Sequence, residues 1–344
     1  MPPRASKKPR RSAPTITADP APKVRLGEGT SIDLPTELYF EILSYFPVVP
    51  FETTVHHSYD SGFHLNVKTL ERQDALRTMS QVSRSWRAFF LPMLWENVEM
   101  AGCRSGPGTG GWFKQCADAL IQKGNGLSKT PELAKYVKRI RLVMSQSSIH
   151  KTLPALKALM TSCSGLKTIH IHFAHSDTAK QFSAEFKPGQ DSFPSVETLI
   201  LPIQAHALLR ACPNAKRLTC NRGRGSQLIT AMRAGCKHLE MVEGFYFYQE
   251  DNMFKKLVKA APNLREIKLS CLPSEDVLKK LQTSFKELKA IEFPGVYLAD
   301  NNEAMERTMT LLKKNLRNCK VTFKANAYAV EKGTATTKVV HIGA

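Results

Sequence analysis

Two hydrophobic patterns divide the chain into two regions. Between residues 31 and 97 apolar residues recur at helical spacing, whereas from 135 to 323 short runs with L-x-x-L-x-L spacing alternate with amphipathic helical stretches. Helical spacing predicts α-helices, and apolar runs that alternate with helices predict the strands of a parallel sheet. We therefore expect an α/β (α+β) chain in which a small all-α module precedes a repeat domain.

The most apolar helix is expected at Leu34–Pro47, with the sequence LPTELYFEILSYFP. Pro35 suits the first helical position, and Glu37 lies where the helix dipole favours a carboxylate. From Glu37 onward the polar residues Glu37, Glu41 and Ser44 form one narrow stripe. A surface helix needs an apolar stripe only a little over ~100° wide. This helix therefore carries apolar surface for a second partner besides its own module.

A second amphipathic helix is expected over residues 72–90, and we expect Pro92 to end it. Apolar residues at alternating steps of four and three give this helix one clean face. These residues are Ala75, Met79, Val82, Trp86 and Phe89. The connection 47–71 is long for a compact helical module, so we expect an inserted surface loop there.

Seven apolar runs predict a solenoid between about Lys135 and Phe323. They start 29, 30, 19, 24, 25 and 24 residues apart, close to the ~20–29-residue period of leucine-rich repeats. One strand and one amphipathic helix cannot bury their apolar faces alone, so the units must stack into an arc with parallel strands and helices outside. The runs are VKRIRL, LKTIHI, VETLIL, AKRLTC, LEMVEG, LREIKL and LKAIEF.

Composition and charge add a basic arm to this picture. The chain has 344 residues, 42% of them hydrophobic, and a formal net charge of +19. Residues 1–30 hold seven Lys/Arg and two Asp/Glu and contain almost nothing to bury, so we expect a disordered basic arm. Its run KKPRR fits either a nuclear import signal or a solubilising arm. The remaining excess is dispersed, which favours anionic partners only weakly.

Cysteine positions predict buried thiols. Cys163, Cys212 and Cys236 stand three residues before equivalent apolar positions of the repeat, where small buried hydrophobes are common. The chain has no C-x-x-C sequence, no apolar run near the ~18 residues of a membrane helix and no apolar signal sequence at its start. We therefore expect reduced cysteines in a soluble protein of the nucleus, the cytoplasm or both.

The helical module resembles an F-box over about residues 31–97. The matching positions follow the family order of leucine–proline, an acidic–leucine step, isoleucine–leucine, valine–serine–arginine, tryptophan and a final leucine–tryptophan. They are Leu34, Pro35, Glu37, Leu38, Ile42, Leu43, Val82, Ser83, Arg84, Trp86, Leu94 and Trp95. The inserted loop departs from the family pattern. The whole chain is similar to the F-box proteins with degenerate leucine-rich repeats that are abundant in mushroom-forming (basidiomycete) fungi.

This resemblance implies a substrate-recognition subunit of a Skp–cullin–F-box ubiquitin ligase. The F-box, residues 31–100, would dock on a Skp-family adaptor and through it on a cullin scaffold. The leucine-rich-repeat-like solenoid, residues 101–323, would bind an unknown target protein for ubiquitination, and residues 324–344 would form a tail. A private core is the alternative role for the adaptor-contact residues. Those contacts, or their immediate support, are assigned to Leu34, Pro35, Leu38, Ile42, Leu43, Val82, Ser83, Trp86 and Trp95.

The outward strand positions form the candidate target-binding face. Solenoid concave surfaces often bind partners, and these positions are mostly basic, so an acidic or phosphorylated segment would suit them. A solvated strand surface is the alternative. His170 and His172 share a strand face, but no cysteine or carboxylate stands at a spacing that would complete a zinc site. The candidate residues are Arg139, Arg141, His170, His172, Arg217 and Lys268.

No motif predicts catalysis. Gly106–Gly111 lacks the Lys-Ser/Thr of a phosphate loop, and the chain has no H-E-x-x-H or G-x-S-x-G sequence. We therefore expect a non-catalytic receptor without cofactor or metal. The alternative function is a basic nuclear nucleic-acid-associated or scaffold protein that uses the repeat face without ligase activity, although neither nucleic acid nor membrane is the favoured partner. The sequence indicates neither the target nor whether recognition needs phosphorylation.

Overall fold

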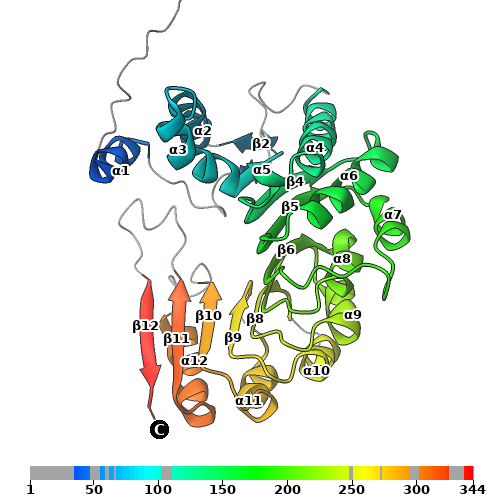
Figure 1. Cartoon of the computed structure of the whole chain (residues 1–344). Coiled ribbons are helices and arrows are strands. Elements are labelled where there is room, and N and C mark those ends of the chain that lie inside the picture. The colour runs from blue at the N-terminus through cyan, green and yellow to red at the C-terminus, as the bar shows by residue number, and fades with distance from the viewer. Residues whose placement is uncertain are drawn as a thin grey trace, which may run out of the picture.

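A ten-stranded sheet and its covering helices form most of the molecule (Figure 1). The strands follow one another across the sheet in chain order, as the stacking of consecutive units requires. Leu34, the basic arm 1–30 and most of Gly106–Gly111 lie outside the described residues. The structure is a computed structural model that describes residues 35–46, 55–58, 62–65, 67–101, 111–247, 251–271, 273–294, 302–324 and 337–343.

Neighbouring strands of this sheet are parallel except for the last pair, which is antiparallel. Parallel strands joined through helices give the predicted α/β fold, which the structure confirms. In order across the sheet, the strands are β3 (Asn97–Glu99), β4 (Arg139–Met144), β5 (Thr168–Ala174), β6 (Thr198–Pro202), β7 (Arg217–Arg222), β8 (Met241–Phe245), β9 (Glu266–Leu269), β10 (Ala290–Pro294), β11 (Cys319–Lys324) and β12 (Lys338–Ile342).

The helices α6 to α11 follow the outer side of the arc (Figure 1). None of the helices in the described part of the chain is both long enough and apolar enough to cross a membrane. Before the sheet come α1 (Thr36–Ser44), the hairpin of β1 (Val55–Ser58) and β2 (Gly62–Leu65), α2 (Val67–Met79) and α3 (Arg84–Glu96). The connecting helices are α4 (Trp112–Ser128), α5 (Pro131–Ala134), α6 (Ile149–Ser162), α7 (Thr178–Glu185), α8 (His206–Arg210), α9 (Ser226–Gly235), α10 (Asp251–Ala260), α11 (Glu275–Ser284) and α12 (Asn302–Asn315), with a short 3-10 turn, Ile203–Ala205, before α8.

The central apolar positions of the repeats form one lateral row against the helices. Because successive strand residues point to opposite faces, this row places the residues on either side of it on the inner face of the arc. All members of the row are at most 3% exposed. The row consists of Val98, Ile140, Ile169, Leu199, Leu218, Val242, Ile267, Ile291 and Val321.

The sheet extends beyond the expected solenoid at both ends. β3 lies in the region 31–100 expected as an F-box, and β12 lies in the expected tail 324–344, so the sheet starts before residue 101 and continues past residue 323. Both end strands lack the strand-then-helix unit on which the prediction relied. β3 has three residues, and β12 pairs antiparallel with β11 instead of following a helical crossover.

The single helix expected over residues 72–90 is in fact two helices, α2 and α3. The backbone of Ser83 is extended, with φ −152°, and its Oγ accepts a hydrogen bond from the backbone N–H of Trp86 at 3.2 Å. A serine in this conformation is an N-cap, so it starts a new helix instead of continuing the previous one.

Two further expectations about this region are corrected. The connection expected as a loop at 47–71 holds the β1–β2 hairpin and the first residues of α2. Pro92 lies inside α3, which continues to Glu96. A proline removes one helical hydrogen bond, but here Trp95 beyond it packs against the sheet core, and this burial favours the continued helix.

The three cysteines at repeat positions are buried free thiols, as predicted. Cys163, Cys212 and Cys236 are at most 1% exposed. Burial raises the pKa of the Cys163 thiol to about 11 and that of Cys236 to about 12. The Sγ of Cys236 donates to the carbonyl oxygens of Leu209 and Cys212, both at 3.3 Å. These thiols therefore act as small packing groups between consecutive turns.

Two glycines of α4 provide a matched test of how closely this helix packs against α6. A Cβ added at Gly124 would lie 2.8 Å from the carbonyl oxygen of Ala155, whereas one at Gly126 would meet nothing within 4 Å. Gly126→Ala should raise the free energy of unfolding by about 0.5–1 kcal/mol, because glycine is unfavourable inside a helix. Gly124→Ala should lower it by about 1–3 kcal/mol, because α4 must shift. Urea unfolding measures both, and equal stabilisation would contradict the close approach.

Candidate partner-binding surfaces

An aromatic cluster holds helix α1 against α3. Tyr39 and Leu43 are buried, and the centroid of the Tyr39 ring lies 5.1 Å from that of Trp86 and 4.8 Å from that of Phe89. Ring pairs at these separations stabilise a contact by more than their buried area alone. One apolar side of α1 is therefore committed to the interior of its own module.

Arg72 of α2 closes the C-terminal end of α1. Its Nη1 donates to the carbonyl oxygen of Leu43 at 3.2 Å and to that of Phe46. A cation at this position satisfies terminal carbonyl groups and complements the helix dipole. Partial burial lowers the pKa of Arg72 from its ordinary value. The sequence analysis missed this residue, because no local pattern links it to a helix that ends almost thirty residues earlier.

Four exposed apolar side chains lie on the same module, and we call them the exposed apolar set: Leu38, Phe40, Tyr45 and Val82. Their exposed fractions are 46%, 55%, 75% and 60%. Among the described residues only two other large hydrophobic side chains are comparably exposed, Tyr246 and Val339. Several large apolar side chains exposed on one small module make it a candidate site of protein contact.

The residues predicted to contact or support an adaptor divide into two groups. Three are exposed and can meet a partner directly, namely Pro35, Leu38 and Val82. Five support the fold, with Leu43 buried, Ile42 and Trp86 half-buried in the same core, Ser83 capping α3 and Trp95 packed on the sheet core. Leu34 lies outside the described residues. Phe40 and Tyr45 were not predicted as site residues, because they match no F-box position.

Helix α3 passes directly into β3, so the module and the sheet share a continuous backbone. α3 ends at Glu96 and β3 begins at Asn97. The Oε1 of Glu96 lies 3.7 Å from the Nζ of Lys138 and 3.5 Å from the Nη2 of Arg139. These groups are partly exposed, so each pair contributes no more than about 1 kcal/mol.

A buried ion pair reinforces this junction. The Nη1 of Arg141 donates to the Oε2 of Glu99 at 3.0 Å, and both side chains are almost completely shielded from water. Glu99 also accepts from the backbone N–H of Ala101 at 2.9 Å, and its carbonyl oxygen accepts from Lys123 at 2.5 Å. Burial raises the pKa of Glu99, and the neighbouring Arg141 opposes that rise. The pair therefore joins the first two strands in a fixed register.

Removing one partner of this pair should destabilise the protein strongly. Arg141→Met should lower the free energy of unfolding by about 3–5 kcal/mol, because Glu99 stays buried without its cation. The double variant Glu99→Gln/Arg141→Met should lose less, because no carboxylate remains. Arg139→Met, at the exposed pair, should lose less than about 1 kcal/mol. Urea unfolding compares the stability of the three variants. A double variant that is less stable than Arg141→Met would contradict the assignment of a buried ion pair.

The candidate target-binding face is the inner face of the sheet, and its charge differs from the prediction. The row that crosses it carries three carboxylates, Glu99, Glu243 and Glu292, so the face is less basic than predicted. Arg141 and His170, expected to be outward and accessible, lie on this face but are buried. In order, the row is Glu99, Arg141, His170, Ile200, Thr219, Glu243, Lys268, Glu292 and Thr322.

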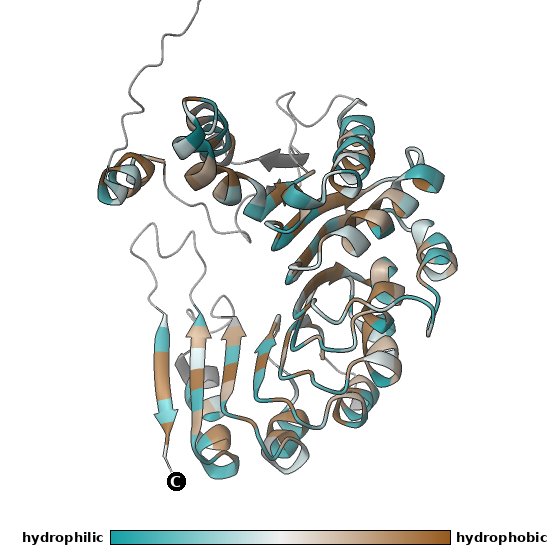
Figure 2. Ribbon diagram, viewed as in Figure 1, coloured by the Kyte–Doolittle hydropathy of each residue, from teal (hydrophilic) through white to brown (hydrophobic). Residues whose placement is uncertain are grey.

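The inner face is open only along its C-terminal part. Every residue of β4 after the first is buried, whereas burial alternates along β9 and β11. Hydropathy changes in parallel, with β6 largely apolar and β9 to β11 mixed (Figure 2). In the open part Arg217 is exposed, and the Nζ of half-buried Lys268 lies 3.6 Å from the Oε1 of Glu266. The Oγ1 of Thr219 donates to Glu243 at 3.2 Å. Acidic neighbours therefore offset much of the basic charge there.

His170 and His172 share the inner face, as alternation predicted, with ring centroids 5.6 Å apart. No group of three or more His, Cys, Asp or Glu residues with metal-binding geometry occurs within the described residues. Burial lowers the pKa of His170 to about 2, and the positive charge of Arg141 and the neighbouring His172 lower it further in the same direction. His170 is therefore neutral in the folded protein, and His172 is half-buried beside it.

This neutral histidine predicts a pH dependence of stability. The pKa of His170 is about 2 in the folded state, against an ordinary value of 6.5. Between these two pH values the unfolded chain therefore binds a proton at His170 and the folded chain does not. Its contribution is fully present above about pH 6.5 and is lost as the pH falls below it, at up to about 1.4 kcal/mol per pH unit. His170→Gln should reduce the loss of stability between pH 7 and pH 5 by about 2 kcal/mol. Exposed His150→Gln is the control, and unfolding curves that fall equally in both would contradict the assignment.

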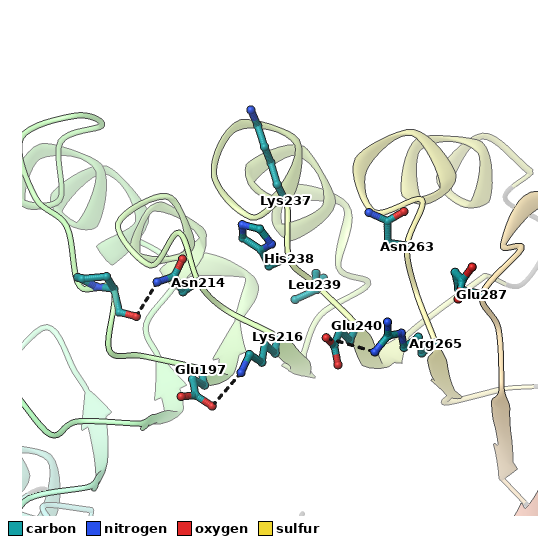
Figure 3. Close-up of a pocket in the computed structure, with 11 residues that line it drawn as sticks. Glu197, Asn214, Lys216, Lys237, His238, Leu239, Glu240, Asn263, Arg265 and Glu287 are labelled. Carbon is teal, nitrogen blue, oxygen red and sulfur yellow. Dashed lines mark hydrogen bonds and ion pairs between the residues drawn. The ribbon is translucent and has the colours of Figure 1, made fainter.

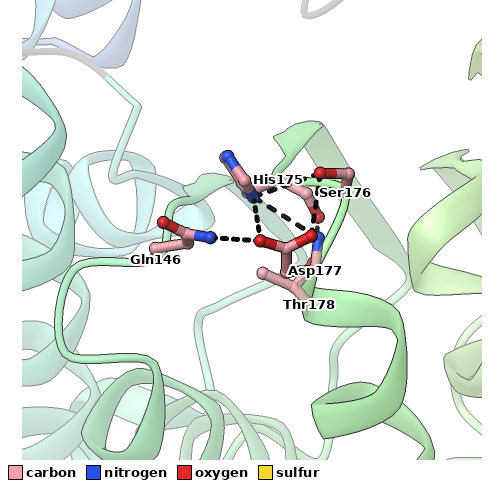
Figure 4. Close-up of polar contacts among 5 residues, drawn as sticks. All are labelled: Gln146, His175, Ser176, Asp177 and Thr178. Atoms are coloured by element: carbon pink, nitrogen blue, oxygen red, sulfur yellow. Dashed lines mark hydrogen bonds and ion pairs between the residues drawn. The ribbon is translucent and has the colours of Figure 1, made fainter.

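A polar cluster between the ends of β4 and β5 holds side chains found in nucleophilic enzymes (Figure 4). Gln146 donates to the Oδ2 of Asp177 at 2.6 Å, and the Nδ1 of His175 lies 3.6 Å from that oxygen. The Oγ of Ser176 lies 3.4 Å from the same Nδ1. A catalytic relay needs serine and carboxylate on different ring nitrogens. The cluster instead orders the turn before α7, where Thr178 donates to the carbonyl of His175 at 2.7 Å.

The chain was compared with models of protein families and with curated proteins. No family model matches the chain, and no curated protein matches it significantly. The likeness of the N-terminal module to an F-box, and of the repeats to leucine-rich repeats, therefore stays a prediction from the residues.

Proposed function

We propose that the chain is the substrate-recognition subunit of a Skp–cullin–F-box ubiquitin ligase. The observation that carries the proposal is that α1 is apolar on two sides. Tyr39 and Leu43 are buried in the module, whereas Leu38, Phe40 and Tyr45 are exposed. The module has the residue order of an F-box, and the exposed apolar side of α1 is suited to bind a second protein.

The exposed side of α1 has the geometry of a helix that lies in a groove. Leu38 and Tyr45 are seven residues apart and therefore lie on the same side, two turns from each other. Phe40 lies on another flank, where its ring packs edge-to-face against Phe89 with centroids 5.6 Å apart. Aromatic side chains held in place lose little freedom on binding and are frequent hot spots. We expect these residues to anchor a Skp-family adaptor.

In this proposal the sheet domain holds the target and contributes no chemistry of its own. The open part of the inner face, β7 to β11, is the larger accessible strand surface, because β4 is buried on both sides. Tethering a target near a ubiquitin-charged enzyme raises the effective concentration of its lysines. The continuous α3–β3 backbone supports this role, because it limits relative motion of the two binding surfaces.

Replacing exposed residues tests the adaptor contact without disturbing the core. The full chain should co-elute with a Skp-family adaptor in size-exclusion chromatography, and Leu38→Asp/Phe40→Asp should abolish co-elution. Because both side chains are exposed, the variant should stay folded and lose only the Phe40–Phe89 ring contact, about 1 kcal/mol. Val339→Asp is the matched control, since Val339 is also 46% exposed but lies on β12.

Three outcomes separate the alternatives. A chain that remains monodisperse and ignores every adaptor offered would overturn the proposal. A nucleic-acid-associated protein would instead bind without adaptor and weaken steeply with salt, whereas an apolar contact persists. Co-purification of a cullin with the adaptor complex distinguishes a ligase subunit from a protein that acts with the adaptor alone.

A further inference from the structure

The turns that precede the strands form one rim of the arc, which we call the rim. Backbone hydrogen bonds of 2.8–2.9 Å link consecutive turns, as from the N–H of Lys216 to the carbonyl of Glu197 and from that of Lys289 to Arg265. Consecutive positions are therefore spaced like neighbouring strands, ~4.8 Å apart. The equivalent position of every unit before the last is charged, at Lys138, Lys167, Glu197, Lys216, Glu240, Arg265 and Lys289, whereas the last unit has Cys319 there, followed by Lys320, the second residue of β11.

In the middle of the rim the charges neutralise one another. Glu197 lies 2.7 Å from Lys167 and 3.5 Å from Lys216, and these cations lower its pKa, with the hydrogen bond from Lys167 the largest cause. Glu240 lies 3.6 Å from Arg265. The pairs Glu197–Lys216 and Glu240–Arg265 line an open polar groove of about 690 Å³ (Figure 3). This part of the rim carries hydrogen-bonding groups but little net charge.

Beyond the groove the rim becomes strongly basic. Among the described residues, the turn before β10, the end of α12 with the turn after it, and the start of β11 carry six exposed cations and one carboxylate, Glu287. Within the described residues no ion pair joins Lys289 or Lys320 to an acidic side chain, although both are exposed. We call these six cations the basic corner: Lys286, Lys289, Lys313, Lys314, Arg317 and Lys320.

We propose that the basic corner binds an acidic segment of a partner protein that lies extended along the rim. From β6 to β10 the groove spans four strand spacings, ~19 Å, which an extended chain of about six residues covers. His238 and Asn263 line this groove with exposed polar side chains that can bond a peptide backbone. The segment's acidic residues then lie over Lys289 and Lys320, and its neutral residues lie in the groove.

The composition of the corner favours carboxylates over nucleic acid. Single-stranded nucleic acid is held by exposed aromatic rings that stack on bases. Among the described residues the exposed aromatics are Phe40, Tyr45 and Tyr246, and the last follows the C-terminal end of β8, at the opposite rim. Phosphate recognition also favours the guanidinium fork, and only Arg317 among the six cations has one. Flexible lysines suit a string of carboxylates.

The basic corner is separate from the surface proposed for the adaptor. Figure 1 places α1 at one end of the view and the starts of β10 and β11 at the other. Binding at the basic corner therefore does not require the proposed adaptor contact. Peptide binding and adaptor binding can be measured on the same protein preparation.

Charge reversal at the corner tests the proposal on the full chain. The probes are a short labelled glutamate-rich peptide, the same peptide with glutamine for glutamate, and a labelled single-stranded oligonucleotide. Fluorescence anisotropy should show binding of the acidic peptide that weakens with salt, and little binding of the glutamine peptide. Lys289→Glu/Lys320→Glu should weaken acidic-peptide binding by about tenfold or more. Lys151→Glu/Lys180→Glu is the control with the same change in net charge, on exposed starts of α6 and α7.

Each outcome decides the proposal. Equal affinity of the two double variants, or no binding of the acidic peptide by the wild type, would overturn it. Tighter binding of the oligonucleotide, lost in the corner variant, would assign the corner to nucleic acid instead. Lys289→Gln/Lys320→Gln should give a smaller loss, and unchanged unfolding curves show that the variants fold. Adaptor co-elution, measured in parallel, should be the same for all of these variants.

Discussion

The buried contact between Glu99 and Arg141 is the constraint on which the arrangement of module and sheet depends. Two desolvated charges are tolerated only in a geometry that keeps them together, so the pair fixes the register of β3 against β4. Because α3 enters β3 without an intervening residue, fixing β3 also fixes α3. The ring cluster around Tyr39 then fixes α1 on α3. The position of the exposed apolar set thus follows from a polar contact at the first strand pair.

The repeat strands were predictable because their signal is local. Each L-x-x-L-x-L run buries the same row against its own helix, so β4 to β10 were found from the sequence. β3 and β12 were missed, because a short strand and an antiparallel edge strand acquire their pairing from residues distant in sequence. The break between α2 and α3 was missed for another reason. Met79 and Val82 keep the helical step across it, so the periodicity continues while the backbone turns at Ser83.

The candidate surfaces were predictable in position but not in exposure. Leu38 and Leu43 belong to equally apolar sides of one helix, and only the places of α2 and α3 decide which is buried. Strand alternation correctly put Arg141 and His170 on the inner face. Their burial could not be inferred, because Glu99, the partner of Arg141, lies 42 residues earlier in a strand that the pattern does not indicate.

The same register argument explains where the charge excess of the chain can lie. On the inner face like charges directly opposite one another destabilise paired strands, and Glu243, Lys268 and Glu292 alternate there accordingly. Rim side chains project into water, where screening weakens repulsion, so Arg265 and Lys289 can be neighbours, with Lys320 next to them at the start of β11. A chain with a charge of +19 therefore has a balanced inner face and a basic corner. Because the corner and α1 lie at different ends of the view in Figure 1, an acidic segment and an adaptor can occupy one molecule together, each held by different physical forces.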